Sequence, residues 1–302
     1  LYDFGASILR SIGDTRRPMY ALIVSGVVNV ILNLLFVVVF HMGVAGAGLA
    51  TVGANATSAV QILYFLTHEE LPIRLSFKSL TIDRDAVSKI LKIGVPAGLQ
   101  GMVFSLANVC IQSGINSFGA GGIAGSAVEL NYEYFAYYLV NAFAQTVVTF
   151  TGQNYGAKRY DRVRRGYFCA IAMTAAWGLC TTFLLIGMAR PLFSIFLQEE
   201  EVMAIGVNYL RIVGLSQMFM MVEQTSIGAF SGLGRTLYPS IISVTFTSAR
   251  IPVAVLLSSV MGLSGIWWAL SISSMVKGCI LFVSFVVFLY VFLERKKDEK
   301  TV

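Results

Sequence analysis

The stretch that decides the fold of this chain is Gly152-Gln-Asn-Tyr-Gly-Ala-Lys-Arg-Tyr-Asp-Arg-Val-Arg-Arg-Gly166, which holds five of its twenty-two Lys and Arg residues. Apolar runs long enough to cross a bilayer stand on both sides of it, at 121–152 and 163–188. A basic loop between two such runs is typical of the cytoplasmic side, because Lys and Arg resist translocation. The stretch therefore predicts a multi-pass membrane protein and sets the orientation of its spans.

The composition favours an all-α integral membrane protein. Of the 302 residues 56% are hydrophobic and 13% are charged, whereas about 25% of a soluble domain is charged. The net charge of +6 falls in loops rather than on a basic face with interleaved aromatics, so nucleic acid is not an expected partner. The cysteines lie in apolar runs without a CxxC pair, so we expect no disulfide, metal or cofactor. They are Cys110, Cys169, Cys180 and Cys279.

Eight apolar runs reach the length of about twenty residues that a membrane span needs. They are 17–40, 43–67, 88–117, 121–152, 163–188, 203–231, 237–260 and 264–293. Residues 1–12 resemble the end of a further helix and the chain starts without Met, so we expect a fragment of a longer protein.

The basic residues are distributed unevenly between the two sides of the membrane. Eighteen fall in loops on the side of Gly152–Gly166, and only Arg190 falls in a loop on the opposite side. The basic side is cytoplasmic by the positive-inside rule. This predicts a plasma-membrane protein with a cytoplasmic C-terminus.

An internal repeat predicts the architecture. Ser11-Ile-Gly-Asp-Thr-Arg-Arg-Pro18 recurs 221 positions later as Gly232-Leu-Gly-Arg-Thr-Leu-Tyr-Pro239, and Met42-Gly-Val-Ala-Gly46 recurs 219 positions later as Met261-Gly-Leu-Ser-Gly265. Both copies start on the predicted cytoplasmic face, so the repeat is parallel, with its axis along the membrane normal. A complete protein would have twelve spans in two six-helix halves.

Each copy also predicts a tight turn into a span. Gly13 and Gly234 suit a sharp helix end, and Pro18 and Pro239 suit the first turn of the next helix. A threonine between them is expected to cap that helix with its side chain. The two threonines are Thr15 and Thr236.

These motifs resemble those of the multidrug and toxic compound extrusion (MATE) transporters. The resemblance is carried by Gly152-Gln-Asn-Tyr-Gly-Ala-Lys158, Leu233-Gly-Arg-Thr-Leu-Tyr-Pro239, its partner Ile12-Gly-Asp-Thr-Arg-Arg-Pro18, and Ile93-Gly-Val-Pro-Ala-Gly-Leu-Gln100. It covers the chain from the end of the family's fourth helix to its twelfth. The first three helices of the family pattern are absent, together with most of the fourth.

The resemblance implies twelve helices in two lobes around a V-shaped cavity. It also implies alternating access and export of cationic or amphipathic organic compounds in exchange for H⁺ or Na⁺, and we expect a monomer. The chain would comprise the end of an incomplete N-terminal lobe (1–68), a cytoplasmic linker (69–87) and a C-terminal six-helix lobe (88–302). The acid that some members carry in the seventh helix has no equivalent here, since 88–117 contains no Asp or Glu.

Charges inside a bilayer are expensive and are functional candidates by default. Glu129 and Glu133 lie roughly 12 and 18 Å from an external helix start at 1.5 Å per residue. Spaced by four, they share a helix face, and burial with mutual repulsion disfavours their charged forms. They are therefore candidates for binding the coupling ion, and the alternative is a structural ion pair with Lys277 or Arg250.

Glu223 and Arg211 are the remaining charges within spans. Glu223, counted at about 30 Å from the external start of its span, suits a cytoplasmic gate or ion relay, and an interaction with Arg235 or a neighbouring loop is at least as good an alternative. Arg211 lies about 12 Å from that start and is expected to extend toward the interface.

Neutral polar side chains give candidates for the wall of a substrate cavity. An i+4 row of amides on one span, interrupted by Phe104, can either line a cavity or form interhelical hydrogen bonds. A second wall, rich in tyrosine, suits cation–π contact with lipophilic cations, and ordinary packing is its alternative. The cavity candidates are Gln100, Asn108, Gln112, Asn116, Tyr134, Tyr137, Tyr138 and Asn141.

Other classes of protein fit less well. A membrane enzyme needs clustered metal ligands or a nucleophile with a base, and the only histidines, His41 and His68, lie at span ends. A lipid-linked oligosaccharide or polysaccharide flippase of the same superfamily is the closer alternative, but such proteins tend to have basic cavities. A membrane scaffold would have little reason to keep paired glutamates in a span.

Overall fold

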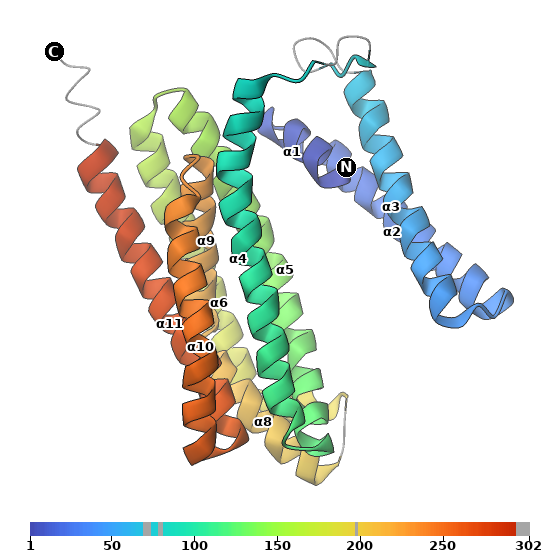
Figure 1. The fold of residues 1–302 in the computed structure, drawn as a ribbon, viewed down its shortest axis with the longest axis vertical. Coiled ribbons are helices and arrows are strands. Elements are labelled where there is room, and N and C mark those ends of the chain that lie inside the picture. The colour runs from blue at the N-terminus through green and yellow to red at the C-terminus, as the bar shows by residue number, and fades with distance from the viewer. Residues whose placement is uncertain (69–73, 78–80, 197–198, 294–302) are drawn as a thin grey trace. The chain divides into compact units, whose positions relative to one another are not determined.

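The computed structural model describes residues 1–68, 74–77, 81–196 and 199–293, without the side chains of Glu129, Glu201, Phe292 and Leu293. In these described residues all regular secondary-structure elements are helices (Figure 1). The chain divides into two compact units, Leu1–Asp83 and Arg84–Val302. Their boundary falls within the predicted linker 69–87, and the assignment of the units to two lobes remains a prediction. The basic segment 295–300, part of the orientation argument, lies outside the described residues.

The first unit is a helical hairpin preceded by a short helix. Its elements are α1 (Tyr2–Ser11), α2 (Arg16–Asn33), the π-helix η1 (Leu34–Val39) and α3 (Gly43–Thr67). Helices α2 and α3 run side by side in Figure 1. A small core holds the unit together, formed by Ala6, Leu9, Ala21, Ile62 and Leu66.

The second unit is a bundle of long helices. They are α4 (Arg84–Asn116), α5 (Ala120–Gly156), α6 (Tyr160–Gly187), α7 (Ala189–Ser194), α8 (Glu200–Gly214), α9 (Gln217–Gly232), α10 (Leu237–Met261), α11 (Leu263–Phe288) and the π-helix η3 (Leu289–Leu293). Across the described parts of both units, six helices are long and apolar enough to cross a membrane, and the number is seven if the bent pair of α8 and α9 counts as one span. The remaining predicted span, 121–152, corresponds to the 37-residue α5, which is long enough to cross a bilayer.

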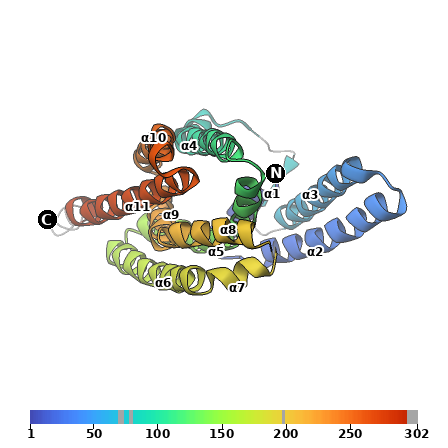
Figure 2. The ribbon, with the colours of Figure 1, turned by 90° about the horizontal axis from the view of Figure 1, so that it is seen from below.

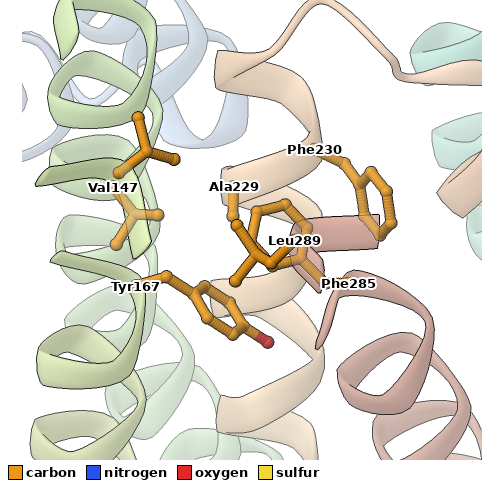
Figure 3. Packing of buried hydrophobic residues seen from close by; sticks show 7 residues of the cluster. Val147, Tyr167, Ala229, Phe230, Phe285 and Leu289 are labelled. Carbon is orange, nitrogen blue, oxygen red and sulfur yellow. The ribbon is translucent and has the colours of Figure 1, made fainter. Parts of the chain in front are cut away.

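Helix α9 lies at the centre of the second unit. It packs against α5, α6 and α11, as the view along the bundle shows (Figure 2). Near its C-terminal end a hydrophobic cluster joins these helices (Figure 3). The cluster is formed by Val147, Val163, Tyr167, Ala229, Phe230, Phe285 and Leu289. Because no residue of α9 is exposed, most of its polar side chains are expected to find partners within the bundle.

The predicted span 203–231 is not one continuous helix. Helices α8 and α9 meet at an angle of 45°, with Gly214 and Ser216 at the junction. A glycine and a serine close together are a common cause of sharp kinks, because Gly weakens the helix and Ser can bond to the backbone of the preceding turn. The Ser216 Oγ does so, donating to the Val213 carbonyl at 2.9 Å. The depth counted for Glu223 along an unbroken helix is therefore also wrong.

The repeated turns have the same backbone geometry in both copies. Gly13 has φ +91° and Gly234 has φ +70°. In each copy the backbone N–H of the residue after the glycine donates to the carbonyl five residues earlier. Asp14 donates to Leu9 at 3.1 Å, and Arg235 donates to Phe230 at 3.0 Å. This pattern, with a left-handed glycine, closes the preceding helix in the way the sequence predicted.

The predicted threonine caps are wrong. Thr15 and Thr236 occupy the N-cap positions, but neither side chain caps its helix. In the first copy the Asp14 carboxylate accepts the backbone N–H groups of Arg16 and Arg17, at 3.0 and 3.2 Å. A carboxylate is the stronger acceptor and interacts favourably with the helix N-terminus. In the second copy the Thr236 hydroxyl instead donates to the Ile93 carbonyl on α4.

Candidate functional site

A cavity of about 450 Å³ lies inside the second unit, beside the bend between α8 and α9. Side chains from α4, α5, α8, α9, α10 and α11 all contribute to its wall. They are Phe104, Ser105, Asn108, Val109, Ile111, Gln112, Ile115, Ser126, Leu130, Glu133, Tyr134, Tyr137, Tyr209, Val213, Ser216, Gln217, Met220, Arg250, Leu270 and Ser274. This volume lies within the range of roughly 300–1,000 Å³ found for small-molecule sites.

Helix α5 contributes an acid and an aromatic wall. Glu133 lines the cavity with a half-buried side chain, next to Tyr134 and one turn before Tyr137. No ion pair joins Glu133 to another side chain that the structure describes. The carboxylate is thus placed where an entering cation or proton could meet it. Its predicted partner Glu129 lies one turn earlier on α5, but that side chain is outside the described residues.

Helix α10 contributes the opposite charge. Arg250 is 6% exposed, its Nη2 donates to the Asn108 Oδ1 at 3.0 Å, and its guanidinium carbon lies 5.7 Å from the centroid of the Phe104 ring. Arg250 and Glu133 both line the cavity. No ion pair between them is present within 4.0 Å. Phe104, which interrupts the amide row in the sequence, therefore belongs to the same cavity wall.

The residues at the helix bend were missed by the sequence analysis. Gln217, the first residue of α9, lines the cavity and is 1% exposed, and its Oε1 has no hydrogen-bond partner within the described structure. Ser216 and Tyr209 also line it. The pair Gly214 and Ser216 was the available signal, because it marks the kink that turns α9 toward the cavity.

Only part of the predicted amide and tyrosine set reaches the cavity. Asn108, Gln112, Tyr134 and Tyr137 line it, and the remaining four lie outside its wall. Among those four, Gln100 accepts a hydrogen bond from Ser240 on α10, and Asn116 accepts one from Gln112. Asn141 bonds to the α5 backbone, and Tyr138 is 70% exposed. For Gln100 the interhelical alternative therefore holds.

Lys277 is the partner of Glu223. The Lys277 Nζ donates to the Glu223 Oε1 at 2.9 Å, and their side chains are 6% and 4% exposed. The suggested pairings of Glu223 with Arg235 and of Lys277 with Glu133 are therefore wrong, and a pairing of Lys277 with Glu129 lies outside the described side chains. The reason is that α11 packs directly on α9, whereas counting residues along each span predicts only their depths. Arg211 is exposed, and its extension toward the membrane interface stays a prediction.

The described residues contain no group of three or more potential metal ligands. The site is therefore built from hydrogen-bonding groups, rings and two opposite charges. Such a set can hold an organic molecule by its polar ends while apolar and aromatic side chains cover its body.

Comparisons with known proteins agree with the predicted fold. The family model described as MatE matches residues 96–256. "Probable multidrug resistance protein YpnP" of Bacillus subtilis is 26% identical over 284 residues, which cover 93% of this chain and 63% of that protein. "Probable multidrug resistance protein NorM" of Thermotoga maritima is 27% identical over 277 residues, which cover 87% of this chain and 58% of that protein. The chain thus spans about three fifths of the length of these relatives.

Solved structures share this helical fold. One is described as "Crystal structure of MATE in the bent conformation", with a TM-score of 0.87, 20% identity, and coverage of 98% of this chain and 66% of that one. Another is an "Outward-facing conformation of a multidrug resistance MATE family transporter of the MOP superfamily", with a TM-score of 0.88 and 20% identity. That match covers 97% of this chain and 66% of the other. The predicted fold class, a multi-pass helical membrane bundle, is confirmed.

Proposed function

Because the chain belongs to the MatE family, we propose that it is part of a secondary active exporter of cationic or amphipathic organic compounds. Names of similar proteins support this activity: relatives from Bacillus subtilis and Thermotoga maritima are called probable multidrug resistance proteins. The likeness to solved transporters supports the fold on which such an activity is built.

The observation that carries the proposal is the position of Glu133 in an aromatic cavity within the second unit. An acid beside Tyr134 and Tyr137 attracts an organic cation by charge and by cation–π contact. The neutral amides of Asn108 and Gln112 add donors and acceptors without fixing one ligand geometry. The wall can therefore accept several molecules of one general type.

We place ion coupling at Glu133 rather than at Glu223. The Glu223 carboxylate is held by Lys277, so proton or sodium binding there would have to break a buried ion pair. Glu133 has no such partner among the described side chains and faces the cavity. Inward H⁺ or Na⁺ would bind Glu133, alone or with Glu129, and its release would alternate with that of the substrate.

Alternating access would expose this cavity first to one side of the membrane and then to the other. The proposed setting is the plasma membrane, with the C-terminus in the cytoplasm, the lipid bilayer as surroundings and a monomer as the working unit. No nucleic-acid partner is proposed.

The test is transport of ethidium by the full-length product of the gene in proteoliposomes. A pH gradient, a Na⁺ gradient or neither is imposed on separate preparations. We expect ethidium movement to depend on one of the two gradients, and Glu133→Gln to abolish the gradient-dependent part. Glu129→Gln is measured alone and together with Glu133→Gln.

A matched control is Glu199→Gln, which removes an exposed acid outside the spans and is expected to leave transport unchanged. If neither gradient moves ethidium through the wild-type protein, multidrug antiport is wrong. If the double variant keeps full gradient dependence, antiport stands but coupling through these glutamates is wrong.

A further inference from the structure

The outward face of α6 changes from basic to apolar along its length. Near the start of the helix Arg162 and Arg165 are exposed. At spacings of three or four residues, which keep to one side of a helix, the same face continues through exposed Cys169, Met173 and Trp177. Figure 2 shows α6 at the outer edge of the second unit. This face therefore combines a charged end with a long apolar part.

The basic end of α6 carries a large excess of positive charge. Five bases and one acid, Asp161, lie within residues 158–165, which leaves a net charge of +4. All five bases are exposed. A basic cluster directly beside a membrane span attracts anionic lipid headgroups. A zwitterionic headgroup brings no net charge to it, so the two kinds of lipid should bind here with different strength.

Arg162 is held in place by a ring of the neighbouring helix. Its guanidinium carbon lies 6.0 Å from the centroid of the Phe150 ring on α5. That ring lies directly against α6, because a Cβ at Gly166 would overlap it. A guanidinium supported in this way loses less freedom on binding, and its planar fork of N–H donors matches a phosphate group.

The rest of α6 is fixed by the core of the bundle. Val163 and Tyr167 are buried in the cluster that joins α6 to α5, α9 and α11. The face with Arg162 and Arg165 thus belongs to a packed helix and not to a free loop. Its two arginines are spaced by three residues, so both can approach one headgroup from the same side.

We propose that the basic end of α6 is a binding site for an anionic phospholipid. Arg162 and Arg165 bind the phosphate, Lys158 and Arg159 add to the attraction, and the acyl chains lie along the apolar face toward Trp177. The site needs only a bilayer, so it goes beyond the proposed export and does not depend on it. It also goes beyond the orientation of the spans, because it predicts a preference for one lipid class in the inserted protein.

The test uses Trp177 as a probe of the lipid beside α6. It is the exposed one among the tryptophans of the described residues, and it lies about 18 Å along the helix from Arg165 at 1.5 Å per residue. The hydrocarbon core is about 30 Å thick, so brominated acyl chains can reach and quench it.

The full-length product of the gene is reconstituted in vesicles that contain phosphatidylcholine and phosphatidylglycerol, with one of the two brominated. The quenching due to Trp177 is the difference from Trp177→Phe. We expect phosphatidylglycerol to bind about fivefold more tightly, as for one basic contact to an anionic surface. Equal binding of the two lipids by the wild-type protein would overturn the proposal.

The double variant Arg162→Gln/Arg165→Gln should reduce this preference to less than about twofold. Arg162→Lys/Arg165→Lys keeps the charges without the fork and should lie between that value and wild type. The matched control is Arg190→Gln/Arg211→Gln, which removes two exposed arginines of the same unit outside the basic loop and should keep the full preference. If the control loses as much as the first variant, net charge and not this site selects the lipid.

Melting temperatures of all variants are recorded in the same vesicles. If Arg162→Gln/Arg165→Gln does not fold, the salt dependence of the wild-type protein decides the question. The preference for phosphatidylglycerol should then fall in 1 M NaCl, where charges are screened over about 3 Å. A preference that is unchanged by salt would contradict binding through the arginines.

Discussion

Glu223 on α9 and Lys277 on α11 form an ion pair with 2.9 Å between Oε1 and Nζ, and both side chains are almost fully buried. Removal of one partner leaves an uncompensated buried charge. We therefore expect Lys277→Met to lower the free energy of unfolding by about 3–5 kcal/mol. The double variant Glu223→Gln/Lys277→Met, which leaves no charge, should recover most of this loss. Unfolding in mixed micelles with increasing dodecyl sulfate measures both.

The exposed pair of Arg190 and Glu200 is the control, because its N–O distance is also 2.9 Å but its side chains are 67% and 78% exposed. Arg190→Met should change the free energy of unfolding by less than about 1 kcal/mol. A double variant at 223 and 277 that is no more stable than the worse single variant would contradict a mainly electrostatic role for the buried pair.

A glycine on α9 allows the close approach of α5. A Cβ at Gly228 would lie 2.8 Å from the Ala144 carbonyl oxygen, so Gly228→Ala must push the two helices apart. We expect a loss of about 1–3 kcal/mol, as for overpacking of a close-packed interior. Gly101→Ala on α4 is the control, because nothing lies within 4 Å of its Cβ. That substitution should be neutral or stabilising by up to about 1 kcal/mol, since Ala favours helix.

The predicted orientation can be tested with single cysteines in a background where the four native ones are replaced by Ser. Lys158 lies in the basic loop between α5 and α6, and Glu199 precedes α8. By the positive-inside rule, a membrane-impermeant maleimide should label Glu199→Cys in intact cells and Lys158→Cys only after permeabilisation. Labelling in the reverse order would show that the basic loops face outward.

The sequence predicted those features that depend on local chemistry or on the membrane. Apolar length identified the six helices that are long and apolar enough to cross a membrane, and the glycines of the repeated turns have the left-handed backbone expected of them. Charge in a span identified Glu133 and Arg250, both of which line the cavity. Each of these inferences needs only neighbouring residues or the cost of a charge in lipid.

Features that depend on which helices touch could not be predicted in this way. Counting residues gave depths for Glu223 and Lys277, but depth does not say that α9 and α11 are neighbours. The side chain of Gln217 reaches the cavity because the span bends by 45° just before it. Counting residues along a straight helix cannot predict that bend. The Thr236 hydroxyl was likewise predicted to cap its own helix, and it instead bonds to Ile93, 143 residues earlier in the chain.

The equivalence of the repeated turns gives a final prediction. Gly13 and Gly234 have φ of +91° and +70°, a backbone conformation that costs other residues about 1–2 kcal/mol. A Cβ at Gly13 would meet nothing within 4 Å, and one at Gly234 would meet only Ile93 at an ordinary 3.8 Å. Steric contact is therefore not a cause of destabilisation at either site.

Gly13→Ala and Gly234→Ala should consequently destabilise the protein by similar amounts, each about 1–2 kcal/mol, through the backbone alone. Gly26→Ala is the control, because Gly26 lies inside α2 with nothing within 4 Å of its Cβ, and Ala there should be neutral or stabilising. The melting temperature in detergent is the measurement. A large loss at Gly234 with none at Gly13 would mean that the two turns, despite their shared hydrogen bonds, do not perform the same structural task.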